Sequence, residues 1–234
     1  MTRPASLPER FVFIVTYGRS GSTLLQNLLN ALPGYQIRGE NNNALFHMMK
    51  AWQSIRSAEP LRGMRASGKS SDQTHPWYGG ELIDPDELGQ TLVQGFVRSV
   101  LKPDPGVRVS GFKEIRFHAN PKAFPAYLNF IHRYFPNAQF IFNTRDHAAV
   151  ARSGWWAEKP HDEVTRILGK ADALFDQYIA DHPDRGCRMH YDDYVADRSA
   201  LEPLFEFLNE DMDEELIQQV FSRRLTHARR DGEP

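Results

Sequence analysis

Residues 15–25 read V-T-Y-G-R-S-G-S-T-L-L, a loop of small residues between two apolar segments. The apolar run before it, residues 11–15, is typical of a strand, and the leucine-rich segment after it, residues 24–29, is typical of a helix. The first backbone amides of a helix have no partner within the helix and carry a partial positive charge, so they stabilise an oxyanion. The stretch therefore predicts a phosphate-binding loop in an α/β protein.

The side chains of this loop also suit an anion. Gly18 and Gly21 let the backbone turn tightly, and Arg19 supplies a fixed positive charge. Hydroxyl donors come from Ser20, Ser22 and Thr23. Taken alone, the loop also allows another interpretation, a glycine-rich turn that binds no ligand.

The loop does not match the ATP-binding motif of nucleotide kinases, G-x-x-x-x-G-K-[ST]. Counted back from Gly21, that motif requires glycine where this chain has Thr16. It also requires lysine where this chain has Ser22. The motif therefore fails at both positions.

Length and composition limit the possible classes of protein. The 234 residues suit a single domain, residues 1–234. Its least patterned stretch, residues 61–80, is expected to be either an acceptor-side lid over residues 60–83 or disordered. A net charge of −2 argues against a nucleic-acid partner, and the single cysteine, Cys187, excludes an internal disulfide framework. The apolar run at 11–15 is far shorter than the roughly 20 residues of a membrane helix. We expect a cytoplasmic protein without an integral membrane segment.

The pattern of apolar residues predicts the order of the elements. Strands are expected at residues 11–15, 107–112, 139–143 and 187–191, with a shorter one at 35–38. Helices are expected at residues 22–31, 43–57, 84–101, 121–134, 148–157, 162–180, 200–209 and 214–223. This alternation predicts an α/β fold, a central parallel sheet of about five strands flanked by helices.

Three stretches, in the expected order, resemble the nucleotide-binding elements of sulfotransferases that use 3′-phosphoadenosine 5′-phosphosulfate (PAPS). The loop T-Y-G-R-S-G-S-T resembles their 5′-phosphosulfate loop. The stretch F-I-F-N-T-R-D-H-A-A-V-A-R-S resembles their 3′-phosphate element, with Arg145 followed eight residues later by Ser153. The stretch M-H-Y-D-D-Y-V-A-D resembles their late-strand segment and makes Tyr191 the residue expected near the adenine. The resemblance extends from residue 11 to about residue 209 and implies the P-loop NTPase-like sulfotransferase fold.

The second element is reasonable on its residues alone. An arginine at the carboxyl end of a strand lies where ligands gather in open α/β sheets, and its planar fork can grip phosphate. Ser153 is expected two turns along the next helix, so it reaches the same anion only if that helix packs beside the crevice. The alternatives are a surface ion pair between Arg145 and Asp146 or a neighbour, and an ordinary surface position for Ser153.

Sulfuryl transfer requires a base near the acceptor and cations near the leaving oxygen. Glu40, in I-R-G-E-N-N-N, resembles the glutamate base of tyrosylprotein sulfotransferases and similar bacterial enzymes. A solvated loop carboxylate is the alternative. Cytosolic sulfotransferases instead carry histidine in a K-x-H context, where this chain has Ile115. This departure favours the glutamate branch and leaves His118 as a fallback base.

Two cations complete the expected catalytic set of Glu40, Lys113 and Arg19. Lys113 resembles the lysine that those enzymes aim at the sulfonate. Arg19 is expected to act electrostatically, since arginine does not readily release a proton. Glu114 is treated as a partner of Lys113 or Arg116. No His/Cys cluster has metal-ligand spacing, so no metal is expected.

Two further groups of residues have open roles. The first group is aromatic and consists of Trp77, Tyr78, Trp155 and Trp156, with His75 near the first pair. These residues either line an acceptor pocket or pack in the core or in an interface. In the tail, Arg223 and Arg224 either reach the 3′-phosphate or belong to a solvated helix end.

The expected function is transfer of a sulfonate group from PAPS to a hydroxyl or amine, with release of 3′,5′-adenosine bisphosphate. The residues expected to bind the nucleotide are Arg19, Ser20, Gly21, Ser22, Thr23, Arg145, Ser153 and Tyr191. A divergent P-loop kinase that uses ATP and magnesium, and a catalytically inactive nucleotide-binding module, are the alternatives. The sequence leaves open both the oligomeric state and the acceptor, which ranges from a small molecule to a sugar, lipid or peptide.

Overall fold

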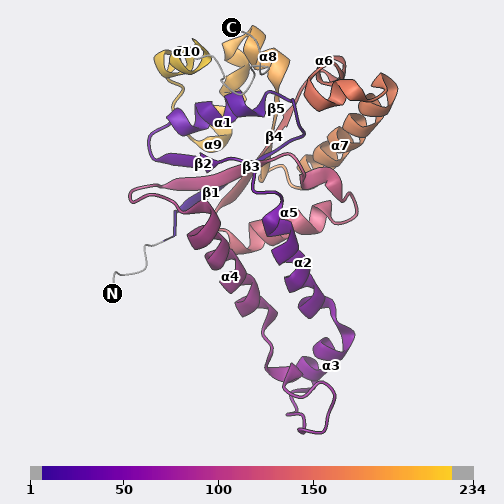
Figure 1. Ribbon diagram of the computed structural model, residues 1–234. Coiled ribbons are helices and arrows are strands. Elements are labelled where there is room, and N and C mark those ends of the chain that lie inside the picture. The colour runs from indigo at the N-terminus through magenta and orange to yellow at the C-terminus, as the bar shows by residue number, and fades with distance from the viewer. Residues whose placement is uncertain (1–6, 223–234) are drawn as a thin grey trace.

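The computed structural model describes residues 7–222, in which a five-stranded sheet lies between two layers of helices (Figure 1). The strands are β1 (Arg10–Val15), β2 (Tyr35–Arg38), β3 (Val109–Glu114), β4 (Ala138–Thr144) and β5 (Gly186–His190). Their order is β2-β3-β1-β4-β5, and every neighbouring pair is parallel. The predicted α/β fold is confirmed, including the short strand at residues 35–38, which forms an edge of the sheet.

Both faces of the sheet are covered, which explains the unbroken apolar run in β1. Phe11, Phe13 and Val15 enter one core, while Val12 and Ile14 enter the other, and all five are fully buried. The first core is completed by α2 (Ala44–Ser57), α4 (Pro85–Phe96), α5 (Phe124–Tyr134) and α7 (His161–Asp181). The second is completed by α1 (Ser22–Ala31), α8 (Tyr191–Ala196), α9 (Glu202–Leu208) and α10 (Glu214–Ser222).

The helices between β2 and β3 form a lobe, residues 44–101, that projects away from the sheet (Figure 1). The stretch 61–80, expected to be the least structured part of the chain, begins inside a helix, α3 (Glu59–Ser67), which the sequence pattern did not predict. Only Leu61 of this helix is buried, so its apolar pattern is too weak to reveal it. The helix predicted at 84–101 is α4 followed by a π-helix, Val97–Leu101.

The structure corrects two further element boundaries near the carboxyl ends of the strands. The helix predicted at 148–157 is α6 (His147–Ala151) followed by a 3₁₀ turn, Gly154–Glu158, and the extended Ser153 and the positive φ of Gly154, 58°, separate the two. The last strand ends at His190, so Tyr191 is the first residue of α8. Arg223 and Arg224 lie outside the described residues.

The topology fixes where a ligand can bind. The chain leaves β1 through α1, which packs on one face, and leaves β3 through α5, which packs on the other. In open α/β sheets, ligands bind at the carboxyl ends of the strands where the connections diverge in this way. Within residues 7–222, no helix is long and apolar enough to cross a membrane.

Candidate active site

The loop between β1 and α1 has the backbone of an anion-binding loop. Arg19 and Gly21 adopt left-handed conformations, with φ values of 68° and 76°. Helix α1 begins at Ser22, and no side chain caps its first amides. Its first turn also contains no acidic residue. The amides and the helix dipole are therefore available for an oxyanion.

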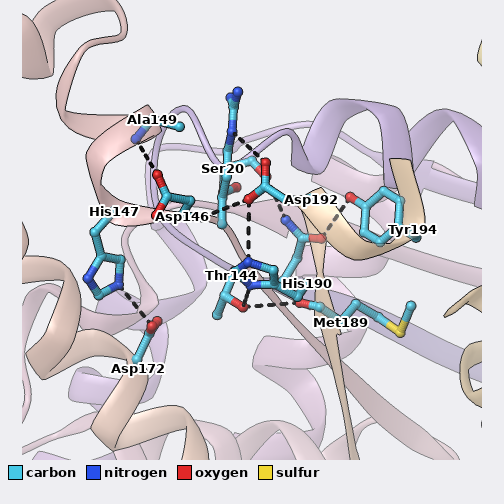
Figure 2. A network of polar contacts seen from close by, with 12 residues as sticks. Ser20, Thr144, Asp146, His147, Ala149, Asp172, Met189, His190, Asp192 and Tyr194 are labelled. Carbon is cyan, nitrogen blue, oxygen red and sulfur yellow. Dashed lines mark hydrogen bonds and ion pairs between the residues drawn. The ribbon is translucent and has the colours of Figure 1, made fainter. Parts of the chain in front are cut away.

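A buried network of polar side chains holds this loop against β4. The hydroxyl of Thr16 lies 2.7 Å from that of Ser20 and donates to the carbonyl of Asn143 at 2.7 Å. The Asn143 amide donates to the Ser20 carbonyl at 3.0 Å, and its oxygen accepts from the Tyr194 hydroxyl at 2.9 Å. Figure 2 shows Ser20 and Tyr194 within this network. The hydroxyl of Ser20 therefore supports the loop, since the residue is fully buried.

The loop forms one wall of a cavity of about 270 Å³ at the carboxyl edge of the sheet. The lining residues are Gly18, Arg19, Gly21, Ser22, Thr23, Glu40, Lys113, Ile115, Arg145, Trp155 and Tyr191. The cavity thus brings together all three expected catalytic residues and most of the expected nucleotide ligands.

Glu40 and Lys113 form an ion pair on one side of the cavity. The Nζ atom of Lys113 lies 2.7 Å from Oε1 of Glu40. The Lys113 side chain is only 9% exposed, while that of Glu40 is 35% exposed. Arg116 contacts the other Glu40 oxygen, Oε2, at 3.5 Å. The Glu40 carboxylate therefore contacts two cations and is still partly exposed to solvent.

Glu114, on the same strand as Lys113, positions the loop that carries Glu40. Its carboxylate is fully buried and accepts from the backbone amides of Asn41 at 3.2 Å and Asn43 at 2.8 Å. The other oxygen accepts from Arg116 at 3.2 Å. Because Arg116 also contacts Glu40, the two carboxylates share one guanidinium. Sequence reasoning treated Glu114 only as a partner of a cation, since the amides that it binds lie 71 or more residues away.

Arg145 lies at the end of β4 and stacks on Tyr191. Its guanidinium lies 4.6 Å from the centre of the Tyr191 ring, and Nη1 donates to the carbonyl of Arg19 at 3.1 Å. Its nearest carboxylate is Asp192, at 3.8 Å, rather than Asp146. Figure 2 shows Asp192 beside His190 and Asp146. The Asp192 carboxylate accepts a hydrogen bond from the backbone amide of Asp146 at 2.8 Å. The anionic partner of Arg145 is therefore loosely held and shared with other groups.

Ser153 reaches the same region by a route that differs from the prediction. The residue follows α6 with extended dihedrals, φ −117° and ψ 128°, so it does not lie two turns along a helix. Its hydroxyl accepts from Nε of Arg19 at 2.9 Å. Arg145 and Ser153 therefore both contact Arg19, which links the two predicted phosphate-binding elements directly.

The two tryptophans that follow Ser153 pack against the phosphate loop. Trp156 donates from its indole nitrogen to the Gly18 carbonyl at 3.0 Å. Trp155 lies so close to Gly18 that a Cβ atom there would be 2.2 Å from its ring. Trp155 lines the cavity and is 50% exposed. Trp77 and Tyr78 are also exposed, but neither lines this cavity.

His118 does not reach the cavity. It lies in the 3₁₀ turn Phe117–Ala119, and its ring meets Tyr17 edge-on at 6.3 Å. Burial lowers its pKa, which disfavours the imidazolium. His118 is therefore not among the residues that line the cavity with Glu40 and Lys113.

Comparisons with known proteins identify the family and the fold of this chain. Residues 11–214 match the model of the sulfotransferase family. The sulfotransferase domain of the Synechococcus PCC 7002 olefin synthase superposes with a TM-score of 0.58 at 20% identity, covering 96% of this chain and 81% of that one. The sulfotransferase domain from the curacin biosynthetic pathway superposes with a TM-score of 0.50 at 17% identity, covering 91% and 77%. At these identities the structures establish a shared fold. No curated protein sequence matches this chain.

Proposed function

This chain belongs to the sulfotransferase family, and from that membership we propose that it transfers the sulfonate of PAPS to a hydroxyl or amine acceptor. The observation that carries the proposal is the meeting of three elements around one cavity. These are the phosphate loop, the Glu40–Lys113 pair and the Arg145–Tyr191 stack. The predicted enzyme class is confirmed by the family match, while the donor and the residue roles belong to the proposal.

The donor fits the cavity by its charges. The amides of the phosphate loop and the side chain of Arg19 hold the 5′-phosphosulfate. Arg145 and Ser153 hold the 3′-phosphate, and Tyr191 packs near the adenine. The surroundings of Arg145 support its role, because its Nε is buried, has no hydrogen-bond partner within residues 7–222 and meets the Asp192 carboxylate only at 3.8 Å. A phosphate oxygen supplies such a partner.

Glu40 acts as the general base. An ionised carboxylate beside the acceptor takes the proton of its O–H or N–H group as the acceptor atom attacks sulfur. The new bond to sulfur forms while the bond between sulfur and the bridging phosphate oxygen breaks. The electron pair stays on that oxygen and 3′,5′-adenosine bisphosphate leaves. This assignment places the chain in the glutamate-base branch of the family.

Lys113 and Arg19 stabilise the charge that moves during transfer. Lys113 is buried and contacts Glu40. Once Glu40 has taken the acceptor proton and is neutral, the Lys113 ammonium stabilises the negative charge that develops on the leaving oxygen. Arg19 remains charged throughout and steadies the phosphosulfate. Among the described residues, no cluster of His, Cys, Asp or Glu could hold a metal ion. Metal independence remains a prediction, to be tested by assays with and without a chelator.

One titration separates this function from its alternatives. The protein is heated with 3′,5′-adenosine bisphosphate, with ATP and magnesium, and without nucleotide. A ligand that binds only the folded state raises the melting temperature. Stabilisation by ATP and magnesium alone would contradict the proposal and favour a kinase. Binding of adenosine bisphosphate without transfer from labelled PAPS to any member of a broad acceptor panel would favour an inactive binding module.

A further inference from the structure

A second cavity, of about 1040 Å³, has strongly basic walls. It lies where α2, α3 and the start of α4 meet α5 and the turn before β5. Its arginines are Arg56, Arg62, Arg65, Arg133 and Arg185, and we call it the arginine groove. Asp86 is the only carboxylate among its described lining residues. None of these residues lines the catalytic cavity.

Most of the positive charge in the groove is not neutralised. Asp86 pairs with Arg133 at 2.9 Å and with Arg56 at 3.5 Å. Arg62, Arg65 and Arg185 form no ion pair within residues 7–222. The whole chain has a net charge of −2, so the excess of positive charge is a local feature of this groove. Such concentrated charge attracts an anionic partner by steering its approach.

The other walls of the groove indicate which kind of anion fits. Trp52 and Phe130 are only 8% and 1% exposed, and the Trp52 indole already donates to the Pro85 carbonyl at 2.9 Å. Neither ring is free to stack on a nucleobase, which argues against single-stranded nucleic acid. Gln53 and Asn129 also line the groove, and although their amide oxygens accept from Lys50 and Arg185, their amide nitrogens can donate to a peptide backbone.

We propose that the arginine groove binds an acidic peptide segment of a partner protein. The planar fork of arginine matches a carboxylate in bidentate fashion, and arginines on several walls suit a chain that carries several carboxylates. The side chains of Gln53 and Asn129 contact the peptide backbone between these carboxylates. Because the groove shares no lining residue with the catalytic cavity, peptide and nucleotide bind at the same time.

The test measures the anisotropy of a short fluorescein-labelled polyglutamate peptide at low and at high salt. Arg62→Glu combined with Arg65→Glu is expected to weaken binding at least about tenfold. The matched control is Arg166→Glu with Lys170→Glu, which reverses two exposed charges on α7 outside both cavities. The control is expected to change the affinity less than about twofold. The milder pair Arg62→Gln with Arg65→Gln, checked by circular dichroism, separates a lost contact from a lost fold.

Three outcomes would overturn the proposal. Equal loss of binding in the groove and control variants would reveal general charge attraction. Displacement of the peptide by 3′,5′-adenosine bisphosphate would place it in the catalytic cavity. Tighter binding of a heparin fragment than of the peptide, dependent on Arg62 and Arg65, would identify a sulfated saccharide as the ligand instead.

Discussion

Lys113 Nζ lies 2.7 Å from Oε1 of Glu40, although 73 residues separate them in the chain. Lys113 is the last residue but one of β3, and Glu40 lies on the loop that follows the neighbouring edge strand, β2. In the proposed mechanism Glu40 is the proton acceptor and Lys113 is the cation beside it. Its function can be tested because a single substitution removes the base and preserves the shape of the side chain.

Glu40→Gln is expected to lower kcat by roughly 10²- to 10⁴-fold, since a neutral amide cannot take the acceptor proton. Binding of 3′,5′-adenosine bisphosphate should stay near that of the wild type. Labelled PAPS assays and calorimetric titration measure the two quantities. The matched control is Glu206→Gln, an exposed glutamate on α9. Full transfer activity in Glu40→Gln would remove Glu40 from the mechanism.

Glu114→Gln tests whether the buried carboxylate positions the base. An amide cannot accept from Asn41, Asn43 and Arg116 at once, because one end of it carries hydrogens. Unpaired buried donors cost about 1–3 kcal/mol, so urea unfolding should shift to lower denaturant. The expected kinetic signature is a lower kcat with an unchanged KM for the nucleotide. A nucleotide KM that rises by the same factor as kcat falls, or no loss of kcat, would argue for a purely structural role.

Arg145→Ala is expected to remove the preference for a 3′-phosphate. The ratio of affinities for 3′,5′-adenosine bisphosphate and 5′-AMP should fall roughly tenfold to a hundredfold, because a charge-assisted hydrogen bond is lost. The neighbouring exposed residue Arg152 provides the control, Arg152→Ala, which should leave the ratio unchanged. If Arg145→Ala weakened both nucleotides equally, Arg145 would not read the 3′-phosphate.

Gly21→Ala should damage the phosphate loop. A Cβ atom there would lie 2.0 Å from the Tyr191 ring, and φ is 76°. The left-handed conformation alone costs an alanine roughly 1–2 kcal/mol. Thermal unfolding and nucleotide titration should both show a loss. Gly169→Ala is the control, because it lies within α7 with open space around it and should stabilise the helix by about 0.5–1 kcal/mol.

Glu210 should make stability fall in acid. Burial raises its pKa, but hydrogen bonds from Arg108, Tyr35 and Arg10 outweigh burial and hold the pKa below its usual value of 4.5. A lowered carboxyl pKa contributes stability above the unfolded value, and the contribution is lost as the pH falls through the folded value. Urea unfolding from neutral pH to below pH 4.5 should therefore show a steeper loss for the wild type than for Glu210→Gln. Parallel curves would contradict this role.

Much of the site follows from the sequence because parallel strands end at one edge of the sheet. Lys113, Arg145 and Tyr191 stand at or just beyond three strand ends, so their meeting with the loop around Arg19 was predictable. The inward direction of the Ser20 hydroxyl was not predictable from the sequence. Its contact with the Thr16 hydroxyl forms only because the loop packs against β4.

Other features depend on contacts that no local pattern reveals. Ser153 lies beyond the end of α6 in an extended conformation, and this conformation brings its hydroxyl beside Arg19. The support that Glu114 gives to the base loop depends on backbone amides from another part of the chain. Amides carry no sequence signature, and short helices such as α3 bury too little apolar surface to show periodicity.

The packing of Trp155 on Gly18 limits how this chain can evolve. A side chain at position 18 would overlap the indole ring, so a larger residue there requires either a shift of the ring or a smaller residue at position 155. Substitutions at the two positions are therefore expected to accumulate in pairs among descendants of this sequence. If the tryptophan is replaced first by a smaller residue, position 18 can then accept a side chain. If the glycine is replaced first, the new side chain meets the indole ring and disturbs the phosphate loop.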